Sequence, residues 1–147
     1  REYNARVKRI VDGGGTWTGV RPAGPLVVDG STITVPFYNQ GSDLVVDTTT
    51  LPQAPGWGFE LVGESETIDA IAILPGDTAD QNKIELTLSG APTVTPYLRY
   101  AYTGPVSKPG GRAGAWGNIR NQDATPSLTD PGRNLVDWAY ISDANPA

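Results

Sequence analysis

Aromatic and carboxylate side chains carry most of the chemistry that this sequence offers. The 147 residues include four Trp and six Tyr, but no His and no Cys. A Ser-His-Asp triad, a thiolate nucleophile, an imidazole or thiolate zinc site and a disulfide framework are therefore excluded within this chain. Three kinds of function remain possible: carboxylate chemistry, a metal site with oxygen ligands, and binding without catalysis.

Two tryptophans are candidates for sugar binding, because aromatic rings stack on the apolar C–H faces of sugars. Trp57 lies between Gly56 and Gly58 at the start of an apolar segment, and Trp116 lies in a glycine-rich stretch before Gly117. Loops on a rigid scaffold commonly carry function. The alternative interpretation is packing, in the core for Trp57 and of the loop onto the sheet for Trp116.

Polar candidates follow in two further places. Tyr97 and Arg99 lie on the same face of a predicted strand. This arrangement is suited to stacking on a ligand or to contact with a ligand carboxylate, but a solvated sheet face explains it equally well. Asn118, Arg120 and Asp123 offer an amide, a guanidinium and a carboxylate within one short segment. They either bind sugar hydroxyls or hold the loop by side-chain to backbone hydrogen bonds.

The carboxylates do not form a catalytic or metal-binding pattern. Glu64 and Glu66 lie in a predicted turn, and Glu60 and Glu85 are predicted to face solvent, so nothing indicates the buried acid of a glycosidase. The three aspartates nearest to a calcium pattern are Asp69, Asp77 and Asp80, whose spacing does not match a loop of alternating ligands. We predict no catalytic residue, no bound metal and no cofactor.

The residue pattern favours an antiparallel sheet as the scaffold. The 18 Gly and 13 Pro residues argue against a long helical bundle. From Thr16 onward apolar residues alternate, and turn signals recur roughly every 8 to 12 residues, as in a β-sandwich. The predicted strands are Pro25–Asp29, Ser31–Tyr38, Leu44–Thr48, Trp57–Val62, Thr67–Leu74, Lys83–Ser89, Pro96–Thr103 and Leu135–Ile141.

Particular strands have more specific predictions. Asp29 and Gly30 form a hairpin turn pair, so the first two strands should pair antiparallel. The strand Thr67–Leu74 is apolar on both faces and is predicted to be central. Trp57, Phe59 and Leu61 should share one face of their strand, as should Leu98, Tyr100 and Tyr102. The predicted fold is an antiparallel β-sandwich, jelly-roll or immunoglobulin-like, preceded by one short N-terminal helix.

The chain is predicted to divide at its N-terminal end. Residues 1–12 show helical spacing of Tyr3, Val7 and Ile10 and are interpreted as the last helix of a preceding domain. Residues 13–147 form the sandwich. The sequence has no Met, so we expect it to be a piece of a longer protein. The net charge of −5 argues against nucleic-acid binding, and there is no hydrophobic run for a membrane span.

Several motifs occur in an order that resembles a known family. They are GTWTGVRP at 15–22, LVVDTTTLP at 44–52, GWGFEL at 56–61, LRYAYTG at 98–104 and GNIRNQDATPS at 117–127. This order resembles the β-sandwich accessory domain that follows the catalytic domain in SGNH/GDSL-type carbohydrate esterases, such as sialate O-acetylesterases and phage tail-associated relatives. The resemblance covers residues 13 to about 140, and it implies that residues 1–12 are the end of a preceding catalytic domain. The long loop over 105–115 is similar to the phage-type relatives. The resemblance also implies that the segment with Asn118, Arg120 and Asp123 lies near the catalytic domain, so contact between domains is a third possible role for it.

The resemblance implies that the catalytic residues lie in a different domain. The family's catalytic Ser lies in a Gly-Asp-Ser block and its His in an Asp-x-x-His motif, both in the preceding domain; here Gly76-Asp77 is followed by Thr78. We therefore expect a non-catalytic module that binds a polysaccharide or other glycan, or supports the neighbouring esterase domain, in an extracellular or virion-surface location. The alternatives are a structural module for domain packing or homo-oligomeric, trimeric assembly, and an enzyme acting on an acetyl ester or glycoside.

Overall fold

The computed structural model describes most of the predicted sandwich region. The described residues are 19–94, 96–102, 116–124 and 142–144, together with positions 132, 134, 136, 138 and 139. The predicted helix over residues 1–12, the domain boundary after it and the loop over 104–114 lie outside these residues. The fold is described from the remaining positions.

The larger sheet has four antiparallel strands in the order β1-β2-β6-β5. Its strands are β1 (Val27–Asp29), β2 (Thr32–Tyr38), β5 (Ile68–Pro75) and β6 (Gln81–Leu88). The predicted hairpin is confirmed: Asp29 pairs with Thr32, and Gly30 has a φ of 58°, a left-handed conformation that glycine adopts without steric cost.

Strands β2 and β6 occupy the centre of this sheet. Strict alternation buries Ile33, Val35 and Phe37 from β2, and β6 likewise buries every second side chain, as predicted. The prediction that Thr67–Leu74 is central is wrong, because β5 is at one edge of the sheet. Its apolar side chains on both faces, such as Ile73 and Leu74, are only half-buried.

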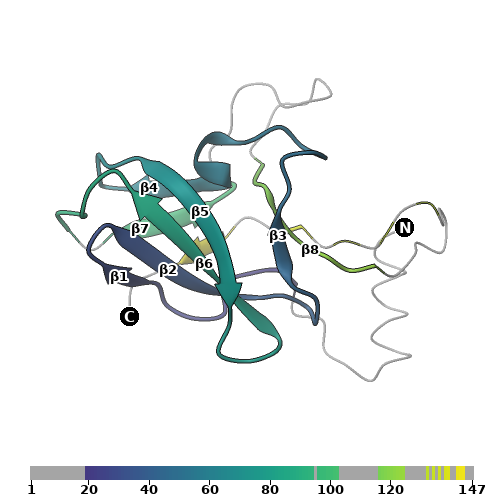
Figure 1. The fold of residues 1–147 in the computed structure, drawn as a ribbon. Helices are drawn as coiled ribbons and strands as arrows, with labels where there is room; N and C mark the ends of the chain where they lie inside the picture. The colour runs from purple at the N-terminus through teal and green to yellow at the C-terminus, as the bar shows by residue number, and fades with distance from the viewer. Residues whose placement is uncertain are drawn as a thin grey trace.

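A three-stranded sheet and a separate strand pair complete the described fold. Strands β4 (Phe59–Val62), β7 (Tyr97–Tyr100) and β9 (Ser142–Ala144) are antiparallel in the order β4-β7-β9. Strand β3 (Leu44–Val46) pairs with β8 (Ile119–Asn121), and this pair lies to one side of the two larger sheets in Figure 1.

The C-terminal strand assignment from sequence is corrected. The predicted strand Leu135–Ile141 does not form at its described residues: Trp138 makes only an isolated bridge with Arg120. Strand β9 begins at Ser142 instead and pairs with β7, where it gains a full antiparallel partner. Half-buried Ala139 packs against the core.

Three aromatic rings join the two larger sheets through one core. Phe37 of β2 lies edge to face against Phe59 of β4 and Tyr100 of β7, with ring centroids 6.1 and 6.4 Å away. All three side chains are buried in the same apolar cluster. The predicted all-β antiparallel class is confirmed. Within the described residues the single helical segment is the 3₁₀ turn η1 (Pro55–Gly58), and none of the sheets closes into a barrel.

Candidate functional site

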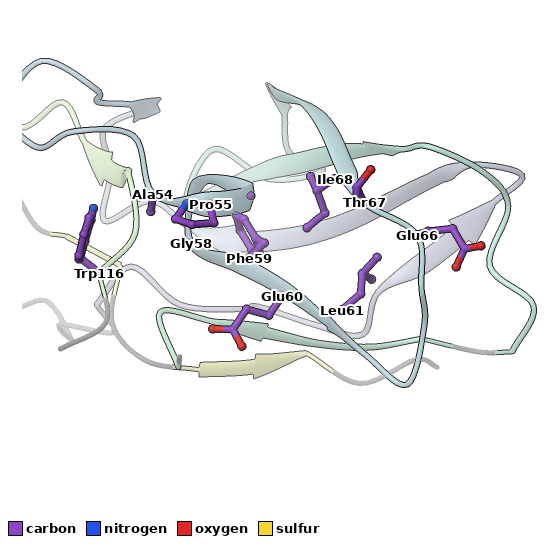
Figure 2. A pocket seen from close by; sticks show the side chains of 11 residues that line it. Ala54, Pro55, Gly58, Phe59, Glu60, Leu61, Glu66, Thr67, Ile68 and Trp116 are labelled. Atoms are coloured by element: carbon purple, nitrogen blue, oxygen red, sulfur yellow. The ribbon is translucent and has the colours of Figure 1, made fainter. Parts of the chain in front are cut away.

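A cleft of about 250 Å³ lies beside strand β4 (Figure 2). This volume is close to the lower end of the roughly 300–1,000 Å³ that small-molecule pockets have. Its described lining combines aliphatic, aromatic and acidic side chains from three segments of the chain, 54–61, 66–68 and Trp116. The lining residues are Ala54, Pro55, Gly56, Gly58, Phe59, Glu60, Leu61, Glu66, Thr67, Ile68 and Trp116.

The cleft is next to the free edge of β4. The Gly58 carbonyl accepts a hydrogen bond from Ala101 N at 2.8 Å, so the antiparallel pattern points the backbone groups of Glu60 toward β7 and those of Phe59 and Leu61 away from it. Of these outward groups, the Phe59 N–H donates to the Gly56 carbonyl at the end of η1. The Phe59 and Leu61 carbonyls and the Leu61 N–H make no other hydrogen bond within the described residues. The edge therefore offers a backbone donor and backbone acceptors to a ligand.

The η1 turn forms one wall, and it corrects the prediction for Trp57. Trp57 does not begin the strand: Gly56 and Trp57 have left-handed φ values of 53° and 55°, and β4 begins at Phe59. The half-buried Trp57 does not line the cleft. A bulky residue in the left-handed region is costly. The surrounding hydrogen bonds, including Asn118 N to the Trp57 carbonyl at 3.0 Å, hold it there.

Trp116 lines the cleft at the end opposite Glu66 (Figure 2). Its side chain is half-buried, and its Nε1–H donates to the Pro52 carbonyl at 3.1 Å. This hydrogen bond fixes the plane of the indole and satisfies its single polar group. The ring can therefore present an apolar face to a ligand without leaving a donor unsatisfied.

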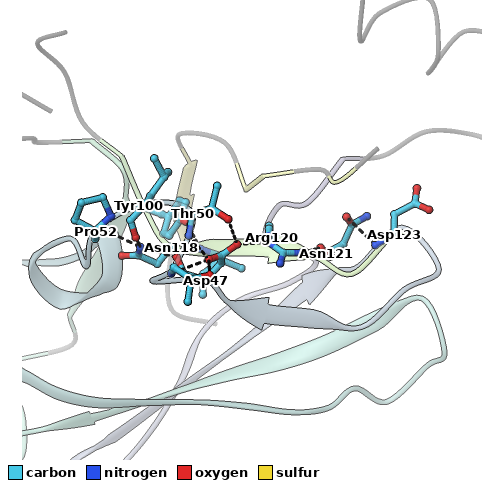
Figure 3. Close-up of polar contacts among 11 residues, drawn as sticks. Asp47, Thr50, Pro52, Tyr100, Asn118, Arg120, Asn121 and Asp123 are labelled. Carbon is cyan, nitrogen blue, oxygen red and sulfur yellow. Dashed lines mark hydrogen bonds and ion pairs between the residues drawn. The ribbon is translucent and has the colours of Figure 1, made fainter. Parts of the chain in front are cut away.

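Asn118 holds the segment that carries this wall (Figure 3). The side chain is completely buried; its Oδ1 accepts from Ala54 N at 2.8 Å, and its Nδ2 donates to the carbonyls of Asp47 at 2.9 Å and Pro52 at 3.2 Å. The interpretation that this region holds a loop by side-chain to backbone hydrogen bonds is confirmed for Asn118. Its contact with a ligand stays a prediction.

Arg120 forms an ion pair with Asp47, with Nε 2.5 Å from Oδ2 (Figure 3). The same carboxylate accepts hydrogen bonds from the backbone and hydroxyl groups of Thr49 and Thr50. Burial acts to raise the pKa of Asp47, but the hydrogen bonds from Thr50 and Arg120 outweigh it and hold the pKa well below the ordinary aspartate value. Arg120 is thus committed to a turn outside the cleft.

The backbones of Gly58 and Gly117 touch behind the cleft. A side chain at Gly58 would meet the Gly117 backbone, and one at Gly117 would overlap the Tyr100 ring. The Tyr100 hydroxyl accepts a hydrogen bond from Ile119 N at 2.9 Å. Burial raises the pKa of Tyr100. Two glycines are required here because three chain segments meet without room for a Cβ.

Tyr97 and Arg99 lie on the other face of β7 from the core. The Arg99 guanidinium carbon is 5.4 Å from the Tyr97 ring centroid and 4.3 Å from that of Tyr102. The prediction that Tyr102 shares the buried face is wrong, because Ala101 has a φ of 51°, which reverses the alternation and leaves Tyr102 54% exposed. Neither Tyr97 nor Arg99 lines the cleft.

Sequence reasoning missed the two carboxylates of the cleft. Glu60 is half-buried in the cleft lining rather than facing solvent as predicted. Glu66 lines the cleft from the connection between β4 and β5. Neighbouring Glu64 accepts from Val94 N at 2.7 Å, and this bond, reinforced by Thr93 and Glu66, lowers the pKa of Glu64. Both glutamates lie beside one edge strand, but this shared position can be recognised only when the order of the strands in the sheet is known.

The predicted candidate Asp123 lies outside the cleft. Asp123 is buried, its backbone N lies 3.5 Å from Asn121 Oδ1, and it does not line the cleft. Across the described residues, no group of three or more His, Cys, Asp and Glu side chains gathers in a way that could hold a metal ion. No helix in the described part of the chain is long and apolar enough to cross a membrane.

Comparisons with protein-family models, with curated proteins and with solved structures found no match to this chain. The function is therefore inferred from the cleft and its lining.

Proposed function

We propose that this chain is a non-catalytic carbohydrate-binding module and that its glycan occupies the cleft beside Trp116. The observation that carries the proposal is the fixed indole at one end of a half-open cleft with apolar and acidic walls. A sugar ring offers an apolar C–H face to such an indole, and its hydroxyls are donors and acceptors for the remaining lining.

The edge of β4 supports the same function. The outward carbonyls of Phe59 and Leu61 and the outward N–H of Leu61 are hydrogen-bonding partners of the kind that sugar hydroxyls need. Phe59, Leu61 and Ile68 supply the apolar surface between them. This mixture suits an amphipathic ligand better than a purely apolar one.

We propose that the two larger sheets form a β-sandwich of jelly-roll or immunoglobulin-like type, supported by the edge-to-face contact of Phe37 with Phe59 across them. The motif order that resembles SGNH/GDSL-type esterase accessory domains supports attachment to an esterase, with a phage tail or receptor-binding protein as one setting.

A glycan array followed by calorimetry tests the binding function. The chain should bind at least one array glycan, and Trp116→Ala should weaken that binding at least tenfold, since it removes the stacking surface. Tyr97→Ala is the matched control, because it removes a half-buried aromatic ring outside the cleft, and it should change the affinity less than twofold. Equal losses in both variants, or no glycan binding, would contradict the proposal.

A second candidate function is assembly through strand β1. This edge strand exposes Val27 by 59% and Val28 by 36%, and exposed apolar edge strands favour pairing with another chain. Light scattering tests it: a stable trimer or dimer that Val27→Lys converts to a monomer supports a structural module. A monomer at all concentrations argues against it.

A further inference from the structure

A cluster of one arginine and two tyrosines lies on the outer face of strand β7, outside the cleft. The Arg99 guanidinium carbon is 4.3 Å from the ring centroid of Tyr102 and 5.4 Å from that of Tyr97. Tyr102 reaches this position because Ala101 has a φ of 51°, which turns the following side chain outward. Such a backbone conformation is uncommon for residues other than glycine. Cation–π attraction to both rings fixes the position of the guanidinium.

The guanidinium of this cluster has no anionic partner among the described residues. Ion pairs in the described part of the chain join Lys83 to Asp77 and Arg120 to Asp47, and Arg99 takes part in neither. The Nε atom of Arg99 is shielded from solvent and donates to no acceptor. Its two terminal amino groups likewise make no hydrogen bond with the described residues, but they are open to solvent. The planar fork of donors is therefore unused at the surface.

The surroundings of Arg99 limit how an anion can bind to it. In the strand register, Glu60 of β4 and Asp143 of β9 are the positions directly opposite Arg99. The chain as a whole carries a net charge of −5, which offsets the attraction that one arginine exerts at a distance. An anion therefore gains affinity only by direct contact with the guanidinium, where the Coulomb energy is largest. A ligand that binds here also needs a second, uncharged contact.

Tyr102 offers that second contact. Its side chain is 54% exposed, and its hydroxyl makes no hydrogen bond with the described residues. Sugars pack apolar C–H groups on aromatic surfaces, and a carboxylate accepts two parallel hydrogen bonds from a guanidinium. We propose that Arg99 and Tyr102 form a binding site for a uronic acid, with the carboxylate on Arg99 and the sugar ring against Tyr102. This site is additional to the glycan-binding cleft, because neither residue lines the cleft.

NMR titration of the full chain tests this site with methyl glucuronide and with methyl glucoside, which lacks the carboxylate. The glucuronide should shift the backbone amide signals of Arg99 and Tyr102 saturably, and the glucoside should bind about tenfold or more weaker. Arg99→Gln should weaken glucuronide binding about tenfold, and Tyr102→Ala about threefold. Arg21→Gln is the matched control, because Arg21 also stacks on a tyrosine, 5.0 Å from the Tyr38 centroid. The control should change the affinity less than about twofold.

Several outcomes would overturn the uronic acid site. They are equal binding of the two sugars, no saturable shift with the glucuronide, and equal losses in Arg99→Gln and Arg21→Gln. Acetate or a glutamate-containing peptide that binds as tightly as the glucuronide would show that the sugar ring is not recognised. Arg99→Lys keeps the charge without the fork, so wild-type affinity in this variant, folded by circular dichroism, would also contradict the site. Trp116→Ala should leave glucuronide binding unchanged, so this result is independent of the cleft.

Discussion

Trp116 and Pro52 are joined across 64 positions of sequence by a hydrogen bond from the indole Nε1 to the Pro52 carbonyl, 3.1 Å long. The same carbonyl accepts a second hydrogen bond from Asn118 Nδ2 at 3.2 Å. One acceptor thus fixes both the ring that lines the cleft and the amide that holds its wall. A ring fixed before the ligand arrives loses less conformational entropy on binding.

Trp116→Phe tests this fixation. Phenylalanine keeps an aromatic face but cannot donate to Pro52, so the ring is less well positioned. We expect the glycan affinity to fall about three- to tenfold, corresponding to the roughly 0.5–1.5 kcal/mol of one hydrogen bond, and less than in Trp116→Ala. Calorimetry with the same glycan measures the difference. A phenylalanine variant with wild-type affinity would show that the hydrogen bond does not position the ring.

Asn118→Ala should destabilise the fold rather than only the site. The substitution leaves Ala54 N and the Asp47 carbonyl without their partners inside the protein. We expect the free energy of unfolding to fall by about 2–4 kcal/mol, because two buried backbone groups are unsatisfied and a cavity is created. Urea denaturation measures it. Gln122→Ala, at an exposed position nearby, is the control and should stay within about 0.5 kcal/mol.

Asp47 should make the free energy of unfolding depend on pH in the acid range. Its folded pKa is held below the unfolded value of about 3.9, so this contribution is complete above pH 5 and is lost as the pH falls through the folded pKa. Asp47→Asn removes the charge in both states. Its destabilisation relative to wild type should be about 1–3 kcal/mol at pH 7 and should shrink toward pH 2. Urea denaturation between pH 7 and pH 2 measures the gap.

A constant gap across this range would show that the ion pair with Arg120 does not carry the effect. Glu64, whose pKa is also lowered, adds its own acid dependence to both proteins. It cancels in the difference between wild type and variant, so the comparison isolates Asp47.

The alternating strands could be predicted from sequence because their periodicity is local. In β2 and β6, side chains such as Ile33 and Ile84 follow the period of two that a half-buried strand imposes. The hairpin at Gly30 was predictable for the same reason, since the turn and its two strands are contiguous. These assignments need no knowledge of distant contacts.

The departures occur where contacts between distant segments override the local pattern. Trp57 adopts a left-handed conformation because Asn118 and Gly117 pack against its turn. Tyr102 turns outward after Ala101, whose N–H is hydrogen-bonded to the Gly58 carbonyl. Strand β8 forms because β3 provides a partner, although its own three residues have no strong period.

The candidate site was predicted in part for a similar reason. Trp116 was identified by its residue type and glycine-rich surroundings, and it lines the cleft. Glu60 and Glu66 were not, because only the edge position of β4 and the path of the following connection bring both carboxylates to one cleft. Single-strand alternation cannot supply that information.

Gly117→Ala tests whether the close approach behind the cleft is required. A methyl group at this position would overlap the Tyr100 ring, whose hydroxyl is hydrogen-bonded to Ile119 N, so the ring cannot move without breaking that bond. We expect the free energy of unfolding to fall by about 1–3 kcal/mol, the usual cost of overpacking, and glycan affinity to fall as the neighbouring Trp116 is displaced. Gly90→Ala is the control, because its new methyl group would only make ordinary contact with Glu66. If Gly117→Ala unfolds at the same urea concentration as wild type and Gly90→Ala, then Tyr100 and the strand after Gly117 have room to separate. In that case the close contact between Gly117 and Tyr100 does not hold Trp116 in place.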